Sequence, residues 1–465
     1  MWMEGTSAFP QHILSKRLLK HSIPIDWYAS IHVLLEDSSM TPTSFVLKAD
    51  LCYSLNPQTV ATHRDSYLVC WEGRCAGVFP SLPAQYRDLP LYDYSGQLAV
   101  PGLVDLHAHA PQYAFRGLGM DLELLDWLNT HAFPEESRYR DLTYAEQAYR
   151  RFVDDMLHGP NTRACLFATL HTEATWLLMD QLEESGLYTM VGKVSMDRSS
   201  PAYLREPDAD HAAQEVCRWL AQCDGRYTRT QPILTPRFIP SCSGELLTRL
   251  HDIQRRTGLP VQSHLSENPG EVALVRTLFP EARHYSDAYH RFGLFGGEGC
   301  PTVMAHCVHV TPEEVDLLAA QQVFVAHCPA SNANLSSGIA PVRRFLEAGV
   351  PVGLGSDVAG GTHLSLFRAM ADAIRASKLR WRLTDDMLSP LTTAEAFYLG
   401  TAGGGAFFGK VGTFTPGFAF DVIVLDDRRY APVRAVSLMD RLEQAIFLSE
   451  DRDITHKFVQ GQQLF

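Results

Sequence analysis

Two histidines separated by one residue, His107 and His109, close an apolar run that extends from 98 to 106. In a β-strand, residues two apart point to the same side, so both imidazoles should face one spot beyond the strand's carboxyl end. Two converging neutral imidazoles make half of a zinc or iron site. The pair taken alone is a weak signal, because 19 histidines among 465 residues produce such spacings by chance.

Further polar side chains follow later apolar runs of the chain. His264, His306 and Asp357 each lie at the carboxyl end of an apolar run of about 4–6 residues, the length of a buried parallel strand. In a (β/α)8 barrel, catalytic groups from different strands converge at that end. A hydrogen-bonded core or loop residue would explain any one of these positions, but a shared site explains all of them. The pattern therefore predicts a metal-dependent active site.

The elements that must position these residues alternate between strand-like and helix-like segments from 99 to 401, which is typical of a parallel α/β fold. An apolar stripe of helical spacing stops at Gly258. Capping sequences at Thr311 and at Asn268 predict the starts of two more helices. Glu267 should therefore lie on the loop between the strand that contains His264 and the helix that begins at Asn268.

The two ends of the chain have a different texture. Residues 27–98 and 402–465 contain short strand-like runs broken by glycine and proline turns. We expect them to assemble into one composite β-sandwich-like domain beside a (β/α)8 TIM barrel formed by residues 99–401. Residues 1–26 are basic and faintly amphipathic, and they are interpreted as an N-terminal extension.

Composition excludes several classes of protein. A hydrophobic fraction of 46% and a charged fraction of 20% describe a soluble globular chain. The formal net charge of −13 argues against nucleic acid or an anionic membrane as the main partner. No apolar stretch reaches about 18 residues, so we expect no transmembrane helix. The ten cysteines include no C-x-x-C pair and are expected to be reduced thiols of a cytoplasmic protein.

With these residues in place, the chain resembles the amidohydrolase superfamily, and specifically its guanine-deaminating branch. The resemblance covers most of the chain, from about residue 67 to the C-terminus. Long strings carry it, namely Pro101–Tyr113, Asp126–Asn129 with Phe133-Pro134, Gly192–Asp197, Thr235–Phe238, Ser263–Asn268, His327–Asn332 and Gly353–Gly361. The His-x-His pair and the strand-end aspartate are common to the superfamily, whereas Pro111-Gln112 and Arg237-Phe238 are more specific to this branch.

The resemblance implies a (β/α)8 barrel, one bound zinc, a homodimer, and a cytosolic enzyme of purine salvage that hydrolyses guanine to xanthine and ammonia. One departure is visible. The family usually runs Gly-Thr-Thr-Thr into its second strand, whereas this chain has Gly-Pro-Asn-Thr-Arg at 159–163. The change falls at the strand's entry, the end of a barrel concerned with stability, so the chemistry is not expected to change.

On this interpretation His107, His109, His264 and Asp357 hold the metal, with water completing the coordination. Zinc suits such a nitrogen-rich set and lowers the pKa of bound water to about 7, although iron stays possible. A second metal would need a bridging carboxylated lysine or a glutamate around the fourth strand. Lys193 is the nearest candidate, and a structural or substrate-side role is favoured for it.

Proton transfer is assigned to the residues around the metal. Glu267 is the expected proton shuttle; its alternative is a glutamate that merely stabilises a helix start. Asp357 would both bind metal and accept the water's proton. His306 would orient the water and stabilise developing charge, unless it is simply a core histidine.

Arg237 and Gln112 are expected to hold the purine. A guanidinium can donate but not accept, so it favours the carbonyl oxygen of guanine over the amino group of adenine. Phe238 would pack on the ring face or simply belong to the core, and His264 and His306 would also contact the substrate. His171, His327 and Asn332 also lie near the ends of expected strands. They are interpreted as structural residues that hold the active-site residues in place.

Two alternatives stay open. The chain could deaminate another ring, such as a pterin, a triazine or an adenosine derivative, on the same barrel. It could also be a non-catalytic scaffold with an amidohydrolase fold, although such a protein should have lost metal ligands. The other zinc-deaminase fold is not expected, since His171-Thr-Glu173 has no P-C-x-x-C partner in the chain.

Overall fold

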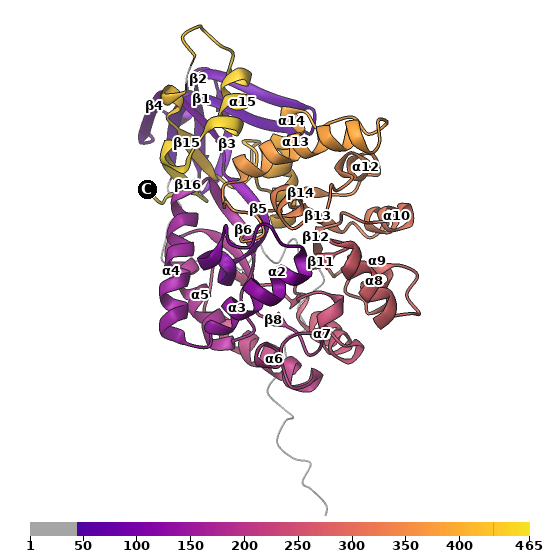
Figure 1. Ribbon diagram of the computed structural model, residues 1–465. Coiled ribbons are helices and arrows are strands. Elements are labelled where there is room, and N and C mark those ends of the chain that lie inside the picture. Colours follow the sequence, from indigo (N-terminus) through magenta and orange to yellow (C-terminus); the bar gives the residue numbers. More distant parts are fainter. Residues whose placement is uncertain (1–43, 431) are drawn as a thin grey trace, which may run out of the picture. The chain divides into compact units, whose positions relative to one another are not determined.

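A computed structural model describes residues 44–430 and 432–465. The predicted extension 1–26 lies outside the described residues, and so does the first part of the predicted β-domain, residues 27–43. The remaining elements can be followed along the chain in Figure 1.

Eight parallel strands form the barrel that the sequence predicts. They are β5 (Leu103–His109), β6 (Asn161–Phe167), β7 (Tyr188–Gly192), β9 (Thr230–Pro232), β11 (Val261–Leu265), β12 (Thr302–His306), β13 (Phe324–His327) and β14 (Val352–Leu354). β14 pairs with β5, and a parallel bridge between Leu234 and Val261 joins the segment after β9 to β11. Apart from part of β9, every residue of these strands is buried, as expected of parallel strands covered on both faces.

Helices follow the strands and cover the outside of the barrel (Figure 1). They include α4 (Leu142–His158), α5 (Thr172–Ser185), α6 (Ala209–Cys223), α7 (Gly244–Thr257), α8 (Pro269–Leu278), α9 (Tyr285–Arg291), α10 (Pro312–Ala320), α11 (Pro329–Asn334), α12 (Val342–Glu347) and α13 (Leu366–Leu383). The predicted end of α7 is confirmed, because Gly258 adopts a left-handed φ of 68°. Capping boxes begin α8 at Asn268 and α10 at Thr311, which confirms both predicted starts.

Both ends of the described chain contribute to one seven-stranded mixed sheet, in the order β17-β16-β15-β4-β1-β2-β3. Its strands are β1 (Phe45–Asn56), β2 (Thr59–Trp71), β3 (Arg74–Phe79), β4 (Leu91–Pro101), β15 (Val422–Leu425), β16 (Ile454–Val459) and β17 (Gln462–Gln463). Phe45, Phe420 and Phe458 pack together in its core. Two further helices, α14 (Thr393–Tyr398) and α15 (Leu438–Leu448), contact β1. The domain boundaries at 98/99 and 401/402 stay a prediction.

The apolar run that leads to the histidine pair is divided between the two sheets. The sequence suggests one strand from 98 onwards, but β4 ends at Pro101 and β5 begins at Leu103. Gly102 lies at the junction, where an added Cβ would come within 2.2 Å of the Thr162 side chain. A glycine is therefore needed for the chain to pass from the mixed sheet directly into the barrel.

The segment that departs from the family pattern, 159–163, also joins barrel and mixed sheet. Arg163 in β6 forms a buried ion pair with Asp421, with a Nε–Oδ2 distance of 2.6 Å. Lys457 in β16 donates to the carbonyl oxygen of Asn161 at 3.0 Å. This segment lies at the entry of β6, at the opposite end of the strand from Phe167, which touches the histidine pair.

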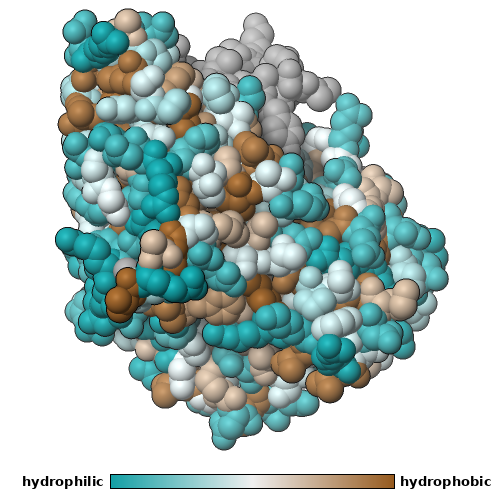
Figure 2. All heavy atoms as spheres, turned by 90° about the horizontal axis from the view of Figure 1, so that it is seen from above, coloured by the Kyte–Doolittle hydropathy of each residue, from teal (hydrophilic) through white to brown (hydrophobic). Residues whose placement is uncertain are grey.

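Among the described residues, no helix is long and apolar enough to cross a membrane. The face seen in Figure 2 is largely hydrophilic, and its apolar residues lie in small groups between polar ones. None of the ten cysteines forms a disulfide, and each is buried except Cys217.

Candidate active site

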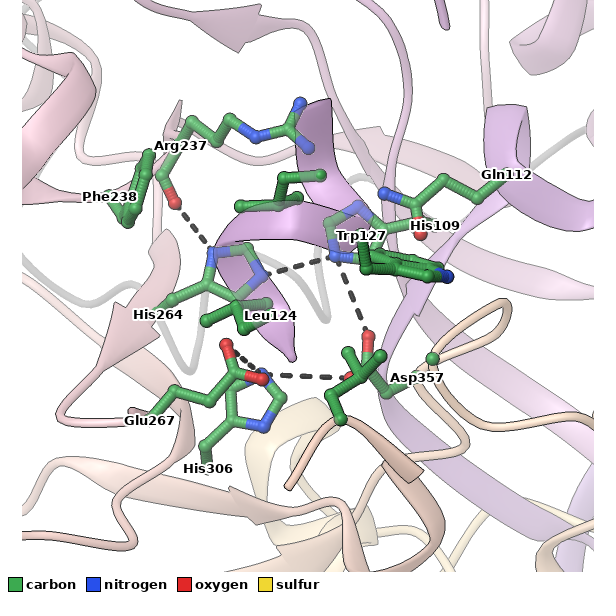
Figure 3. Close-up of a pocket in the computed structure, with 13 residues that line it drawn as sticks. His109, Gln112, Leu124, Trp127, Arg237, Phe238, His264, Glu267, His306 and Asp357 are labelled. Carbon is green, nitrogen blue, oxygen red and sulfur yellow. Dashed lines mark hydrogen bonds and ion pairs between the residues drawn. The ribbon is translucent and has the colours of Figure 1, made fainter. Parts of the chain in front are cut away.

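The carboxyl ends of four barrel strands bring the predicted metal ligands and the predicted catalytic residue His306 together. His107 and His109 lie at the carboxyl end of β5, His264 is in β11, and His306 ends β12. Asp357 follows β14 by three residues. Its Oδ1 lies 3.2 Å from the Nε2 of His107 and 3.6 Å from that of His109. The Nε2 atoms of His109 and His264 lie 3.1 Å apart, and Figure 3 shows these side chains pointing toward one another.

This cluster fits a tetrahedral zinc ion. A zinc–nitrogen distance of about 2.0–2.1 Å puts two ligands roughly 3.3 Å apart, close to the spacings observed. The Nε2 of His107 is buried and has no hydrogen-bond partner among the described residues. The Nδ1 of His264 donates to the carbonyl oxygen of Arg237 at 2.6 Å, which leaves its Nε2 free to bind a metal. The donor types suit the ion, and so do the spacings within the group of His107, His109 and Asp357 and between His109 and His264.

The protonation states agree with metal binding. Burial lowers the pKa of both His109 and His264, and neighbouring imidazoles lower it further, so both rings stay neutral at physiological pH. Burial acts to raise the pKa of Asp357, but the nearby His107 overcomes this and holds it well below its usual range. Neutral imidazoles and an ionised carboxylate are the forms that coordinate a cation.

Glu267 lies on the other side of the cluster, directly before α8. Its Oε2 is 3.5 Å from the Nε2 of His306, and Ser337 donates to its Oε1 at 3.3 Å. Burial raises the pKa of Glu267 well above its usual value, and the charges of Asp357 and Glu271 raise it further. The raised pKa favours the protonated carboxyl of Glu267, which is the form that can deliver a proton into the pocket.

His306 faces the same space from β12. Its Nδ1 is 2.9 Å from the Oδ1 of Asn332, which fixes the ring, and its Nε2 lies 3.7 Å from the Oδ2 of Asp357. His327 is buried at the end of β13, and burial lowers its pKa to about 3, so it is neutral. Of the residues interpreted as supports, Asn332 directly contacts a site residue.

The backbone is strained where these groups leave their strands. Ser266, His306 and Asp357 adopt left-handed φ values of 49°, 73° and 47°. Non-glycine residues rarely adopt this conformation, which costs roughly 1–3 kcal/mol and is found most often at functional sites. The strain allows the side chains to turn from the strand ends into a shared pocket.

A pocket opens beside the cluster, with about 400 Å³ of empty space that includes open solvent. Apolar side chains of α2 (Leu124–Trp127) and of the π-helical turn η3 (Leu128–Ala132) form one wall. The lining residues are His109, Gln112, Leu124, Trp127, Leu128, Arg237, Phe238, His264, Glu267, His306, Leu335, Asp357 and Gly360. A flat ring could therefore lie between apolar side chains with polar groups at its edges.

Arg237 and Gln112 lie along one side of this pocket, with their nitrogen ends directed toward each other in Figure 3. Arg237 directly follows β10 (Thr235–Pro236), and Gln112 lies in the short helix η2 (Ala110–Phe115) after β5. Both contact Glu136, a buried residue of α3 (Phe133–Arg138) that sequence reasoning missed. Phe238 lines the pocket next to Arg237.

Several candidates lie elsewhere. Lys193 is buried, but its Nζ is 2.7 Å from the Oε1 of Glu206, which leaves it engaged away from the cluster. His171 is not among the residues that line the pocket. Glu173, the second half of the H-x-E sequence, pairs with Arg218 at 2.9 Å.

The missed residues had little sequence signal. Trp127 and Leu128 belong to the string Asp126–Asn129, and Glu136 follows Phe133-Pro134, so the resemblance included their neighbourhood without assigning them a role. Their segment contains a π-helical turn, which interrupts the spacing by which an amphipathic helix is recognised.

The chain is similar to known proteins in both sequence and structure. The model of the amidohydrolase family matches residues 98–464. A guanine deaminase of Dictyostelium discoideum is 38% identical over 382 residues, which cover 80% of this chain and 83% of that protein. The guanine deaminase of Homo sapiens is 34% identical over 394 residues, which cover 82% of this chain and 85% of that protein.

The chain belongs to the guanine deaminase family of amidohydrolases. Among solved structures, a guanine deaminase from C. acetobutylicum with guanine bound in its active site is 41% identical, with a TM-score of 0.88. The match covers 91% of this chain and 100% of that one. The barrel and the mixed sheet are thus the fold of a guanine deaminase.

Proposed function

We propose that this chain hydrolyses guanine to xanthine and ammonia, with one zinc ion held by His107, His109, His264 and Asp357. The observation that carries the proposal is the content of a single pocket. Three of the proposed metal ligands (His109, His264 and Asp357), the acid Glu267 with its raised pKa, and the fixed donor Arg237 all line it. Membership of the guanine deaminase family supports the same reaction.

A bound zinc ion would supply Lewis acidity and make hydroxide available at neutral pH. Glu267 holds a proton that it can give to the ring nitrogen beside the reacting carbon. Asp357, an ionised carboxylate, can accept the proton of the attacking water, and His306 would orient that water between the two. Asp357 then passes the proton that it took from water to the amino group, so that ammonia leaves, and the hydroxyl proton of the adduct returns to Glu267 as the new carbonyl forms.

Recognition of guanine rests on the opposite side of the pocket. Arg237 can only donate, so its guanidinium suits the ring carbonyl of guanine and meets another donor in adenine. Gln112 would add an amide contact, and Phe238 would pack against the ring. Trp127 and the leucines beside it exclude water from the ring's faces.

Finer statements about the metal, the location and the partners belong to this proposal. Zinc is preferred to iron because a three-imidazole, one-carboxylate set suits it. A cytoplasmic location is supported by ten free cysteines. Guanine is proposed as the small-molecule partner, and a homodimer is proposed on the family resemblance alone, with no role for nucleic acid or a membrane.

The proposal is tested by giving the purified, zinc-loaded protein guanine, adenine, a pterin and a triazine while recording ultraviolet spectra and ammonia. We expect guanine to be consumed and adenine to be unchanged. Preferential turnover of a pterin or triazine would replace the substrate but keep the reaction class. If the protein bound no stoichiometric metal and turned over none of these rings, the result would favour the alternative of a non-catalytic scaffold with an amidohydrolase fold.

A further inference from the structure

Glu136 contacts both residues that are proposed to hold the purine. Its carboxylate accepts from both terminal nitrogens of Arg237, and the Nη2–Oε1 distance is 2.8 Å. Its Oε1 also accepts from the Nε2 of Gln112 at 2.8 Å. Phe133, three residues earlier on α3, packs against the same guanidinium at 5.0 Å from the ring centroid. One face of α3 therefore holds the recognition side of the pocket together.

These contacts fix the orientation of the Gln112 amide. Its nitrogen is held by Glu136, and its Oε1 accepts from the backbone N–H of Ala359 at 3.4 Å. A rotation of the amide by half a turn would place an oxygen against the carboxylate and a donor against an N–H. Glu136 thus determines which edge of Gln112 faces the pocket.

The same contacts determine charge. Arg237 is 3% exposed and Glu136 is 1% exposed, so solvent screens neither charge. A buried guanidinium without a partner would make this side of the pocket strongly positive, whereas the paired groups carry no net charge. The bidentate geometry also holds the guanidinium plane in place, as a single point charge would not.

We propose that Glu136 is a positioning residue that locks Arg237 and Gln112 and neutralises Arg237, so that the pocket binds neutral guanine and releases its more acidic product. This inference rests on the proposed function. Deamination replaces an amino group by a carbonyl, which leaves a ring N–H flanked by two carbonyls and makes xanthine a stronger acid than guanine. An unpaired Arg237 would retain the xanthine anion, and Glu136 prevents this.

The test is the variant Glu136→Gln, which keeps the side-chain length and removes the charge. We expect KM for guanine to rise about 10- to 100-fold, with zinc content unchanged, because hydrogen bonds to a charged group are lost. We also expect the ratio of the inhibition constant for xanthine to the KM for guanine to be lower in the variant than in the wild type. The ratio of the xanthine inhibition constant to KM should fall by about tenfold between pH 6 and pH 9 in the variant and should not fall in the wild type.

Binding of xanthine should be measured by calorimetry as well, with and without zinc, so that the result does not depend on turnover. The matched control is Glu135→Gln on the same helix, where Glu135 pairs with Arg138 and Tyr144 outside the pocket. This control should retain the wild-type KM and ratio. A purely structural role for Glu136 would weaken guanine and xanthine in parallel and leave the ratio unchanged, which would overturn the proposal.

If Glu136→Gln does not fold, Glu136→Asp keeps the charge and shortens the side chain, so it cannot reach both partners. It should raise KM for guanine about fivefold or more while keeping the wild-type ratio, since a single charged hydrogen bond is weakened. An unchanged KM would overturn the positioning role. Failure of the wild type to consume guanine would instead refute the proposed function, and that measurement comes first.

Discussion

The Nε2 atoms of His109 and His264 lie 3.1 Å apart, although the two residues are in different strands of the barrel. Two neutral imidazoles this close need a cation or a shared proton between them. The other imidazole nitrogen of His264 is already bound to the Arg237 carbonyl, so the free nitrogens can only face inward. The pair therefore marks the proposed metal position more sharply than the His-x-His spacing does.

Replacing His264 by Ala should remove both bound zinc and turnover, because the cluster would lose one of its three imidazoles. Chelation of the wild type should likewise abolish turnover, and added zinc should restore it. Metal analysis and activity are measured on the same preparations. His171→Ala serves as the control, and equal loss of zinc from this variant would show that the ligand set is wrong.

Replacing Glu267 by Gln should keep zinc and lower kcat by about 10²- to 10⁴-fold, the usual contribution of a general acid. KM should change little. A defect confined to KM would make Glu267 a binding residue.

The pH dependence follows from the raised pKa of Glu267. The protonated carboxyl is the form that donates, and a raised pKa keeps this form populated at neutral pH. As pH increases through that pKa the proton is lost, so kcat/KM of the wild type should fall on the alkaline side. Residual activity of Glu267→Gln should lack this fall, and a profile identical to the wild type would assign the titration to another group.

The sequence predicted that His107, His109, His264 and Asp357 lie together because each one follows a short apolar run, and parallel strands bring such ends together. Their role as metal ligands stays a prediction. It did not predict that the run before His107 is divided at Gly102, because the steric reason, Thr162, is a neighbour only in the folded barrel. Glu136 was missed for a similar reason. Its partner Arg237 is 101 residues away, and nothing local distinguishes a buried glutamate on a short helix from an exposed one.

Arg237→Ala should reduce kcat/KM for guanine steeply while zinc is retained, since unpaired buried polar groups can cost factors of about 10⁴–10⁵ in discrimination. Arg237→Lys should recover only part of the lost activity. A lysine keeps the positive charge, but its ammonium lacks the planar fork that contacts Glu136. Steady-state kinetics with guanine and adenine measure the effect. Intact guanine turnover in the alanine variant would refute this role.

Asp421→Asn should destabilise the fold without altering the site. Its partner Arg163 would be left buried and unpaired between barrel and mixed sheet, at a cost of about 3–5 kcal/mol. Thermal unfolding should shift clearly downward, while kcat/KM at low temperature stays within about threefold of the wild type. Asp426→Asn, whose partner Arg428 is mostly exposed, should leave the midpoint near the wild type. Equal shifts of the unfolding midpoint in both variants would show that the buried Arg163–Asp421 pair contributes no more to stability than an exposed pair does.

The most direct test of the account is a titration of metal-free protein with zinc while ammonia release from guanine is recorded. A mononuclear site predicts that activity rises in proportion to added zinc and saturates at about one ion per chain, with one ammonia released per guanine consumed. Saturation at two ions per chain, or stoichiometric zinc binding without release of ammonia from guanine, would contradict it.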